Sequence, residues 1–245
     1  MGSRMTSESQ APRRFARGAQ FLRNRLSPEK ALGLHLTIGL MVMVLGFWCF
    51  AEIADDLGPD DSMMVRDQQV TNWFQKQAAP RLTLVAQAVT LLGSVGFLTA
   101  GSVICVIVLL RKRAWNRAIA VVSTMIGGSV LNILLKHFFQ RQRPVFENPL
   151  VTLSSFGFPS GHTMGATLFY GLLALLITFS MRSWFWRALV CLAAFLIVAA
   201  IGITRIYLGA HYLTDVLAAI AAGGVWLALC WTAVESFRKR KRRSS

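Results

Sequence analysis

An imidazole and a carboxylate stand four residues apart in the segment Arg205-x5-His211-x3-Asp215. On a helix, residues four apart share one face, so these two side chains would meet. A carboxylate in that position accepts the imidazole N–H and fixes the tautomer. The other ring nitrogen of His211 is then available as a nucleophile or as a base. The pair therefore indicates a reactive histidine that is oriented by Asp215.

A second histidine follows a short segment suited to binding an anion, Pro159-Ser160-Gly161-His162. Ser160 is a favourable N-cap residue, and Gly161 leaves the first backbone N–H groups of a helix open to a ligand. These N–H groups and the helix dipole attract negative charge. His162 would stand beside the bound anion, where it could act as an acid.

Three basic side chains complete the pattern: Lys136, Arg143 and Arg205. Two arginines and a lysine are the usual clamp for phosphate oxygens. A clamp for an anion, a nucleophilic histidine and a second histidine as acid together indicate phosphoryl transfer.

The elements that must position these groups are apolar enough to cross a membrane. The 245 residues are 54% hydrophobic and 15% charged, whereas soluble domains carry about 25% charged residues. Each long apolar stretch reaches the roughly 17 to 25 residues that span hydrocarbon. We predict an all-α integral membrane bundle over residues 34–234, between basic segments at 1–33 and 235–245. Its six transmembrane helices would lie at about 34–53, 84–110, 116–136, 162–181, 187–206 and 211–234.

The distribution of charge predicts how the bundle is oriented. With six spans both flanking segments lie on one side, and nineteen of the 26 Lys and Arg residues lie there, against seven on the other side. The positive-inside rule makes the richer side cytoplasmic. Membrane orientation therefore accounts for the net charge of +15, and we expect membrane lipids but no nucleic acid as partners. The candidate residues would lie at the external face, beside a short interfacial helix around Val70-Thr71-Asn72-Trp73-Phe74.

Four of the seven outer cations cluster at helix ends, namely Lys136, Arg141, Arg143 and Arg205. A single such charge would be explained as a side chain that snorkels to the membrane surface. Ionisable groups that converge at one membrane depth from several helices are costly and usually functional. We therefore interpret the cluster as a site.

These motifs resemble the three-part signature of the type 2 phosphatidic acid phosphatase (PAP2) superfamily. The three parts are Lys136-x6-Arg143-Pro144, Pro159-Ser160-Gly161-His162 and Arg205-x5-His211-x3-Asp215, in order along the chain. The third motif of the family usually begins Ser-Arg, and here it begins Thr204-Arg205. Threonine keeps the hydroxyl, so the departure concerns a minor contact.

The resemblance implies a role for each matched residue. His211 would become phosphohistidine with Asp215 orienting it, and His162 would protonate the leaving oxygen and then activate water. Lys136, Arg143, Ser160, Gly161 and Arg205 would hold the phosphoryl oxygens. No metal ion and no other cofactor is implied. Outside the motifs, we expect Arg141 to contact a headgroup or a loop, His137 to flank Lys136, and His35 to be a packed or interfacial histidine.

We therefore predict hydrolysis of a membrane lipid phosphate or diphosphate, the substrate of this site, in a bacterial cytoplasmic membrane. Undecaprenyl diphosphate, phosphatidylglycerophosphate and phosphatidic acid are the candidate substrates. A lipid phosphotransferase would use the same residues, so that alternative stays open. An anion or lipid transporter would need inverted repeats and charges deep in the spans, and a haloperoxidase would need a soluble chain, so both are disfavoured.

Overall fold

The computed structural model describes residues 31–57, 62–146, 149–151 and 153–243. Every regular element in these ranges is an α-helix. In chain order they are α2 (Ala31–Asp55), α3 (Ser62–Lys76), α4 (Pro80–Leu91), α5 (Val95–Arg111), α6 (Trp115–Phe139), α7 (Gly161–Thr178), α8 (Trp184–Tyr207) and α9 (Leu213–Arg243).

The predicted all-α, six-span membrane fold is confirmed. Six helical segments of the described chain are long and apolar enough to cross a membrane. They are Leu36–Asp55, Pro80–Arg111, Trp115–Phe139, Gly161–Thr178, Trp184–Tyr207 and Leu213–Phe237. Their outward faces carry large apolar side chains, such as Phe47 and Trp48, that would contact lipid tails.

The second span differs from the single helix expected over 84–110. It consists of two helices, α4 and α5, joined by a turn at residues 92–94. Pro80 occupies the first turn of α4, where its missing N–H is tolerated. Ser94 starts α5 by accepting a hydrogen bond from the N–H of Phe97 at 3.3 Å. The apolar run that predicted the span has no charge at the break, so hydropathy alone does not reveal the turn.

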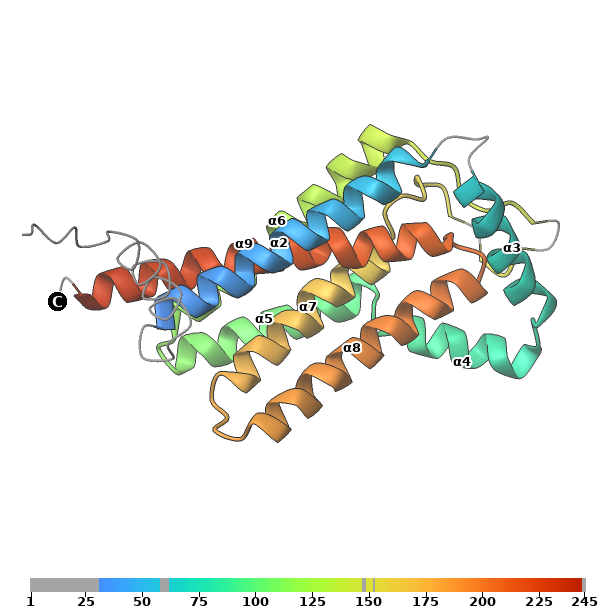
Figure 1. Ribbon diagram of the computed structural model, residues 1–245. Helices are drawn as coiled ribbons and strands as arrows, with labels where there is room; N and C mark the ends of the chain where they lie inside the picture. Colours follow the sequence, from blue (N-terminus) through green and yellow to red (C-terminus); the bar gives the residue numbers. More distant parts are fainter. Residues whose placement is uncertain (1–30, 58–61, 147–148, 152, 244–245) are drawn as a thin grey trace, which may run out of the picture.

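The helices pack around α7, which contacts α5, α6, α8 and α9. Helix α2 lies along α9, and α4 lies against α8 (Figure 1). The beginning of α2 and the end of α9 lie at the same end of the bundle, as an even number of spans requires. Helix α3 crosses the opposite end, which we call the α3 end, and contacts α8 and α9 there.

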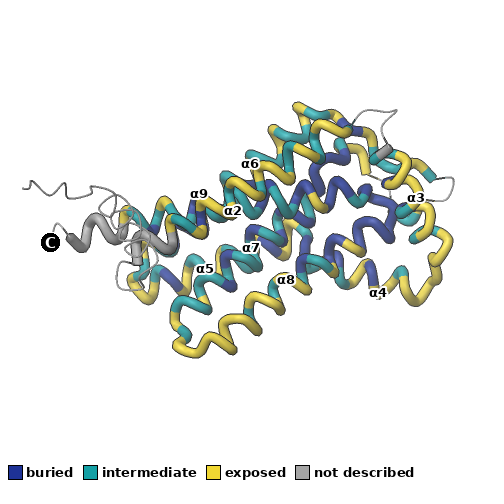
Figure 2. The backbone as a smooth tube through the Cα atoms, viewed as in Figure 1, coloured by how far each residue is buried: buried dark blue, intermediate teal, exposed yellow. Residues whose placement is uncertain are grey.

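Buried residues gather at the α3 end of the bundle, where α8 finishes and α9 begins (Figure 2). From Thr204 to Val216 every residue except Leu213 is buried. The helix predicted around Val70–Phe74 is present as α3, which is longer than that segment and carries the fully buried Asp67 and Thr71. The α3 end therefore contains the longest run of buried residues in the described part of the bundle.

Candidate active site

The loop that follows α6 carries Arg143 back over the α3 end. Helix α6 ends at Phe139, and Gln140 caps it with a left-handed conformation, φ 47°. Arg143 then donates to the carbonyl oxygens of Ser155 at 2.6 Å and Ala210 at 2.6 Å. Its guanidinium therefore joins the α6–α7 loop to the turn before α9.

Lys136 lies on the last turn of α6 and points toward the same loop. Its Nζ donates to the carbonyl oxygen of Phe156 at 2.6 Å. A Cβ atom added to Gly161 would lie 3.3 Å from Oδ1 of Asn132 and 4.0 Å from Cε of Lys136. The start of α7 thus approaches α6 closely because residue 161 has no side chain. Lys136 and the first N–H groups of α7 consequently lie beside each other.

The start of α7 has the N-cap that the sequence predicts. The hydroxyl of Ser160 accepts a hydrogen bond from the N–H of Thr163 at 3.4 Å and lies 3.0 Å from Oγ1 of Thr163. The N–H of Ser160 donates to the carbonyl oxygen of Asp215 at 3.0 Å, which ties α7 to α9. The N–H groups of Gly161 and His162 stand in the first turn, where the helix has no carbonyl for them.

The turn between α8 and α9 brings Arg205 and His211 together. Gly209 adopts a left-handed conformation, φ 68°, that favours glycine. This turn lets the N–H of His211 donate to the carbonyl oxygen of Arg205 at 3.3 Å. The guanidinium of Arg205 is buried and donates to Oγ1 of Thr90 on α4 at 3.1 Å. Its Nε is buried and has no hydrogen-bond partner among the described residues.

His211 lies between a carboxylate and a guanidinium. Its Nδ1 is 3.4 Å from Oδ2 of Asp215, and its Nε2 is 3.1 Å from Nη1 of Arg143. This contact with Asp215 is too long or poorly aligned to be a hydrogen bond, and Nδ1 has no hydrogen-bond partner among the described residues. Catalytic contacts of this kind commonly tighten when substrate binds. His211 precedes α9, which begins at Leu213, so the pair meets across the helix start and not along one helical face as predicted.

Burial lowers the pKa of His211 to about 4. Asp215 opposes this shift, while the positive charges of Arg143 and Arg205 add to it. The imidazole is therefore neutral at pH 7. Because arginine can only donate, the Nε2 atom that faces Arg143 carries the lone pair, and the proton lies on Nδ1 toward Asp215.

His162 is half-buried on the first turn of α7 and interacts electrostatically with four of the other candidate groups. Its side chain makes no hydrogen bond to the described part of the chain, so its ring nitrogens are open to a ligand. The structure thus brings together the whole predicted set: Lys136, Arg143, Ser160, Gly161, His162, Arg205, His211 and Asp215.

The expectation that Arg141 contacts a headgroup or a loop omits its main partners, which are carboxylates on α3 and α9. Its guanidinium is buried and donates to Oδ1 of Asp215 at 2.6 Å and to Oδ2 of Asp67 on α3 at 2.7 Å. It also donates to Oγ1 of Thr214 at 2.7 Å and lies over the ring of Tyr212, 4.6 Å from the centroid. Burial opposes the charge of Arg141, but Asp215 and Asp67 outweigh it and raise its pKa.

Asp67 and Thr214 were missed by the sequence interpretation. Asp67 is the one acidic residue of α3, and this was the only feature of the sequence that could have pointed to it.

Of the remaining histidines, His137 is exposed and its ring makes an edge contact with the ring of Phe156. The expectation for His35 concerns a side chain outside the described ones. No group of three or more His, Cys, Asp or Glu side chains that could hold a metal ion occurs among the described residues.

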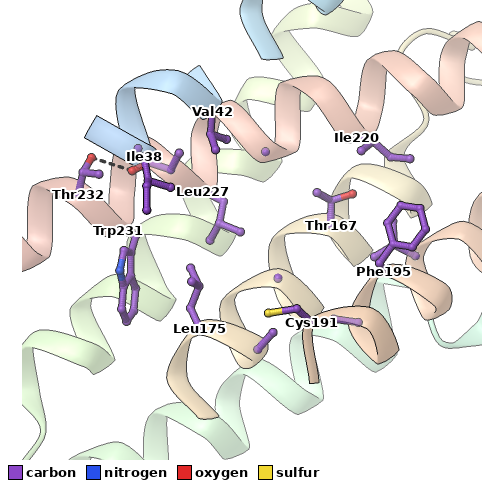
Figure 3. A pocket seen from close by; sticks show the side chains of 17 residues that line it. Ile38, Val42, Thr167, Leu175, Cys191, Phe195, Ile220, Leu227, Trp231 and Thr232 are labelled. Atoms are coloured by element: carbon purple, nitrogen blue, oxygen red, sulfur yellow. Dashed lines mark hydrogen bonds between the residues drawn. The ribbon is translucent and has the colours of Figure 1, made fainter. Parts of the chain in front are cut away.

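An apolar groove of about 400 Å³ lies between α2, α7, α8 and α9, away from the candidate residues (Figure 3). Its labelled lining includes Val42, Thr167, Phe195 and Leu227. Thr167 lies five residues after His162 on α7, about 8 Å farther along the helix axis and on a different side of the helix. A smaller cavity of about 340 Å³ lies beside Arg143, under the α6–α7 loop.

Comparisons with known proteins find similarity in both sequence and fold. Phosphatidylglycerophosphatase B of Bacillus subtilis strain 168 is 40% identical over 98 residues, which are 38% of this chain and 46% of that relative. The aligned part thus spans less than half of the relative's length. A crystal structure of the first transmembrane PAP2 type phosphatidylglycerolphosphate phosphatase from Bacillus subtilis superposes with a TM-score of 0.72. It is 29% identical, and the match covers 81% of this chain and 96% of that one.

A second solved structure, Aquifex aeolicus LpxE, superposes with a TM-score of 0.52 at 26% identity. That match covers 67% of this chain and 93% of the other. Residues 117–239, about half of the chain, match the sequence profile of the PAP2 superfamily, and they contain every candidate residue. The chain is an integral membrane protein that belongs to the PAP2 superfamily.

Proposed function

We propose that this protein is a membrane lipid phosphatase that hydrolyses a lipid phosphate or diphosphate through a phosphohistidine at His211. The observation that carries the proposal is the position of the neutral imidazole, with Nδ1 toward Asp215 and Nε2 toward Arg143. A neutral imidazole with a proton on the far nitrogen has its lone pair available for attack. The arginine that faces this lone pair would bind the phosphoryl oxygens.

The reaction needs two steps. In the first, Nε2 of His211 attacks phosphorus, an N–P bond forms, and the bond between phosphorus and the lipid oxygen breaks. For a lipid monophosphate, His162 gives its proton to that oxygen, which leaves as a hydroxyl group. For a diphosphate the bond to the bridging oxygen breaks instead, and the lipid monophosphate leaves. In the second, His162 takes a proton from water, the water oxygen attacks phosphorus, and the N–P bond breaks. Inorganic phosphate leaves, and His211 regains its lone pair.

Charge that develops on the phosphoryl oxygens would meet donors that are already in place. Lys136 and Arg143 extend toward the proposed phosphoryl site from α6 and the loop after it, and Arg205 extends toward this site from α8. The unpartnered, buried Nε of Arg205 is a donor that a phosphoryl oxygen would satisfy. The N–H groups at the start of α7 add two further donors. Ser160 supports them by capping the helix.

The substrate class follows from the surroundings of the site. Six apolar spans and an apolar groove between α2, α7, α8 and α9 suit a phosphate ester with long hydrocarbon tails. The similarity to phosphatidylglycerophosphatase B favours phosphatidylglycerophosphate as the substrate. Undecaprenyl diphosphate and phosphatidic acid remain candidates with the same reacting group.

We place the site at the external face of a cytoplasmic membrane. All candidate residues lie at the α3 end of the bundle, whereas α2 begins and α9 ends at the other end. The topology predicted from the sequence assigns nineteen of the 26 Lys and Arg residues to that side of the membrane, and the positive-inside rule makes it cytoplasmic. The substrate would therefore be drawn from the outer leaflet.

The proposal is tested by phosphate release from a panel of lipid phosphates, with purified protein in detergent and EDTA present. We expect release from at least one phospholipid phosphate, none with His211→Ala, and no inhibition by EDTA. Transfer of labelled phosphate to an added lipid alcohol instead of water would identify a phosphotransferase. No turnover of any lipid phosphate by folded protein would refute the proposal.

A further inference from the structure

Arg141 connects three elements at the α3 end, and none of the motifs assigns it a role. It lies in the α6–α7 loop, and its guanidinium joins Asp67 on α3 to Asp215 on α9. The three side chains are almost fully buried, with at most 7% of any of them exposed. We call Asp67, Arg141 and Asp215 the charge chain.

The charge chain carries a net charge of −1, because it contains two carboxylates and one guanidinium. Arg141 donates a hydrogen bond to Oδ1 of Asp215. The other oxygen, Oδ2, accepts from the N–H of Tyr212 at 2.9 Å and faces Nδ1 of His211. If Arg141 and Asp215 were alone, the guanidinium would neutralise the carboxylate on which His211 depends. Asp67 shares the guanidinium, so one negative charge is left for the imidazole.

Asp67 also holds the beginning of α9. Its Oδ1 accepts from the N–H of Thr214 at 3.1 Å, and its Oδ2 accepts from the hydroxyl of the same threonine. A carboxylate at the first turn of a helix satisfies free N–H groups and interacts favourably with the dipole. The residue that sets the charge of the chain thus also fixes the turn that carries His211 and Asp215.

We propose that Asp67 is a positioning residue of the phosphatase site, which acts through Arg141 to preserve the negative charge of Asp215 toward His211. The inference rests on the proposed function. It makes α3, which lies outside the residues matched by the family, part of the catalytic apparatus. During phosphoryl transfer His211 becomes positively charged, so the preserved charge would stabilise the transition state more than the free enzyme.

The primary experiment compares Asp67→Asn with Asp67→Glu and with a matched control. Asparagine keeps the size of the side chain but removes its charge. We expect kcat to fall about tenfold to a hundredfold, by analogy with the loss of the partners that orient metal-binding histidines. KM should change far less, and Asp67→Glu should recover most of kcat. Gln75→Ala, which removes the bond between α3 and the carbonyl oxygen of Tyr207, should leave kcat within about twofold.

A double variant separates the charge from the packing. Asp67→Asn leaves Arg141 and Asp215 with no net charge, whereas adding Arg141→Gln returns the chain to −1. We expect the double variant to be more active than Asp67→Asn alone. If Asp67 only held α3 in place, removing Arg141 as well would lower activity further, and that result would overturn the proposal.

A second readout does not depend on turnover. The nitrogen chemical shifts of His211 report its titration in the intact protein. The groups that face this imidazole are Asp215, Arg143, Arg205 and His162. Loss of negative charge in Asp67→Asn should move the titration to lower pH, and Gln75→Ala should not move it.

Unchanged kcat together with unchanged titration in Asp67→Asn would refute the inference, whatever the wild-type substrate is. If the wild-type protein were inactive but the His211 titration of Asp67→Asn still differed from that of the wild type, only the proposed function would be refuted.

Discussion

The guanidinium of Arg143 lies against the lone pair of His211, with Nη1 3.1 Å from Nε2. In the free protein this contact occupies the atom that we assign as the nucleophile. An incoming phosphoryl group must therefore displace Arg143 from the imidazole, and its oxygens then offer the guanidinium new acceptors. The same arginine would cover the nucleophile before substrate binds and stabilise the phosphoryl oxygens afterwards.

Replacing Arg143 with lysine tests this double role. A lysine keeps the charge but cannot hold two phosphoryl oxygens in a fixed plane. It would also lose some of the bonds to Ser155 and Ala210 that shape the loop. We expect Arg143→Lys to remain folded and to lose about tenfold to a thousandfold in kcat, as for loss of a transition-state donor. Steady-state kinetics on the best lipid phosphate measures this.

Arg187→Lys is the matched control, because Arg187 is exposed at the other end of the bundle and its guanidinium hydrogen-bonds, within the described residues, to the carbonyl oxygen of Met181 alone. Its activity should equal that of the wild type. Orthovanadate, a mimic of phosphate, should inhibit both the wild type and this control and lose potency in Arg143→Lys. Full activity and full vanadate sensitivity in Arg143→Lys would mean that Arg143 is an interfacial anchor.

The low pKa of His211 predicts how stability depends on pH. Burial lowers that pKa from the ordinary 6.5 to about 4 in the folded protein. Between these values the unfolded state binds more protons than the folded state, so stability falls as pH decreases from about 6.5 toward 4. Thermal unfolding in detergent across this range should show the decrease, and it should be shallower in His211→Asn, which cannot titrate. An equal slope in both proteins would contradict the assigned protonation.

The spans and the motifs could be predicted from the sequence because each depends on local signals. Long apolar stretches predict membrane helices, and Ser160 before Gly161 predicts the start of α7. The break in the second span could not be predicted, since the turn at residues 92–94 lies inside an uncharged run. It depends on how α4 and α5 pack against α8 and α7 separately.

The charge chain could not be predicted for a different reason. Asp67 and Arg141 are 74 residues apart, and no periodicity relates a carboxylate on one helix to a guanidinium in a distant loop. Their pairing arises only when α3 folds over the start of α9. The one hint was that Arg141 is a cation near the motifs with no role in them, and it led only to the expectation of a headgroup or loop contact, without the two carboxylates.

Sidedness can be measured with single cysteines at the two ends of the bundle. The four native cysteines, of which Cys49 and Cys191 are exposed, would first be replaced by alanine. Val145 in the α6–α7 loop is 90% exposed, and Arg182 before α8 is also exposed. In intact cells an impermeant thiol reagent should label Val145→Cys and should label Arg182→Cys only after the membrane is opened. The reverse pattern would place the site on the cytoplasmic side.

The central claim, that His211 carries the phosphoryl group, is tested most directly by trapping the intermediate. Protein mixed with a phosphate-labelled lipid substrate is quenched with alkali within one turnover and digested for mass spectrometry. We predict base-stable, acid-labile phosphate on the peptide that contains His211, and none on His211→Ala. His162→Gln should accumulate more of this species than the wild type, because the second step then lacks its base. The substrate for this comparison needs a good leaving group, so that the first step proceeds without the acid. Phosphate found on His162 or on a serine, or turnover by His211→Ala, would contradict the account.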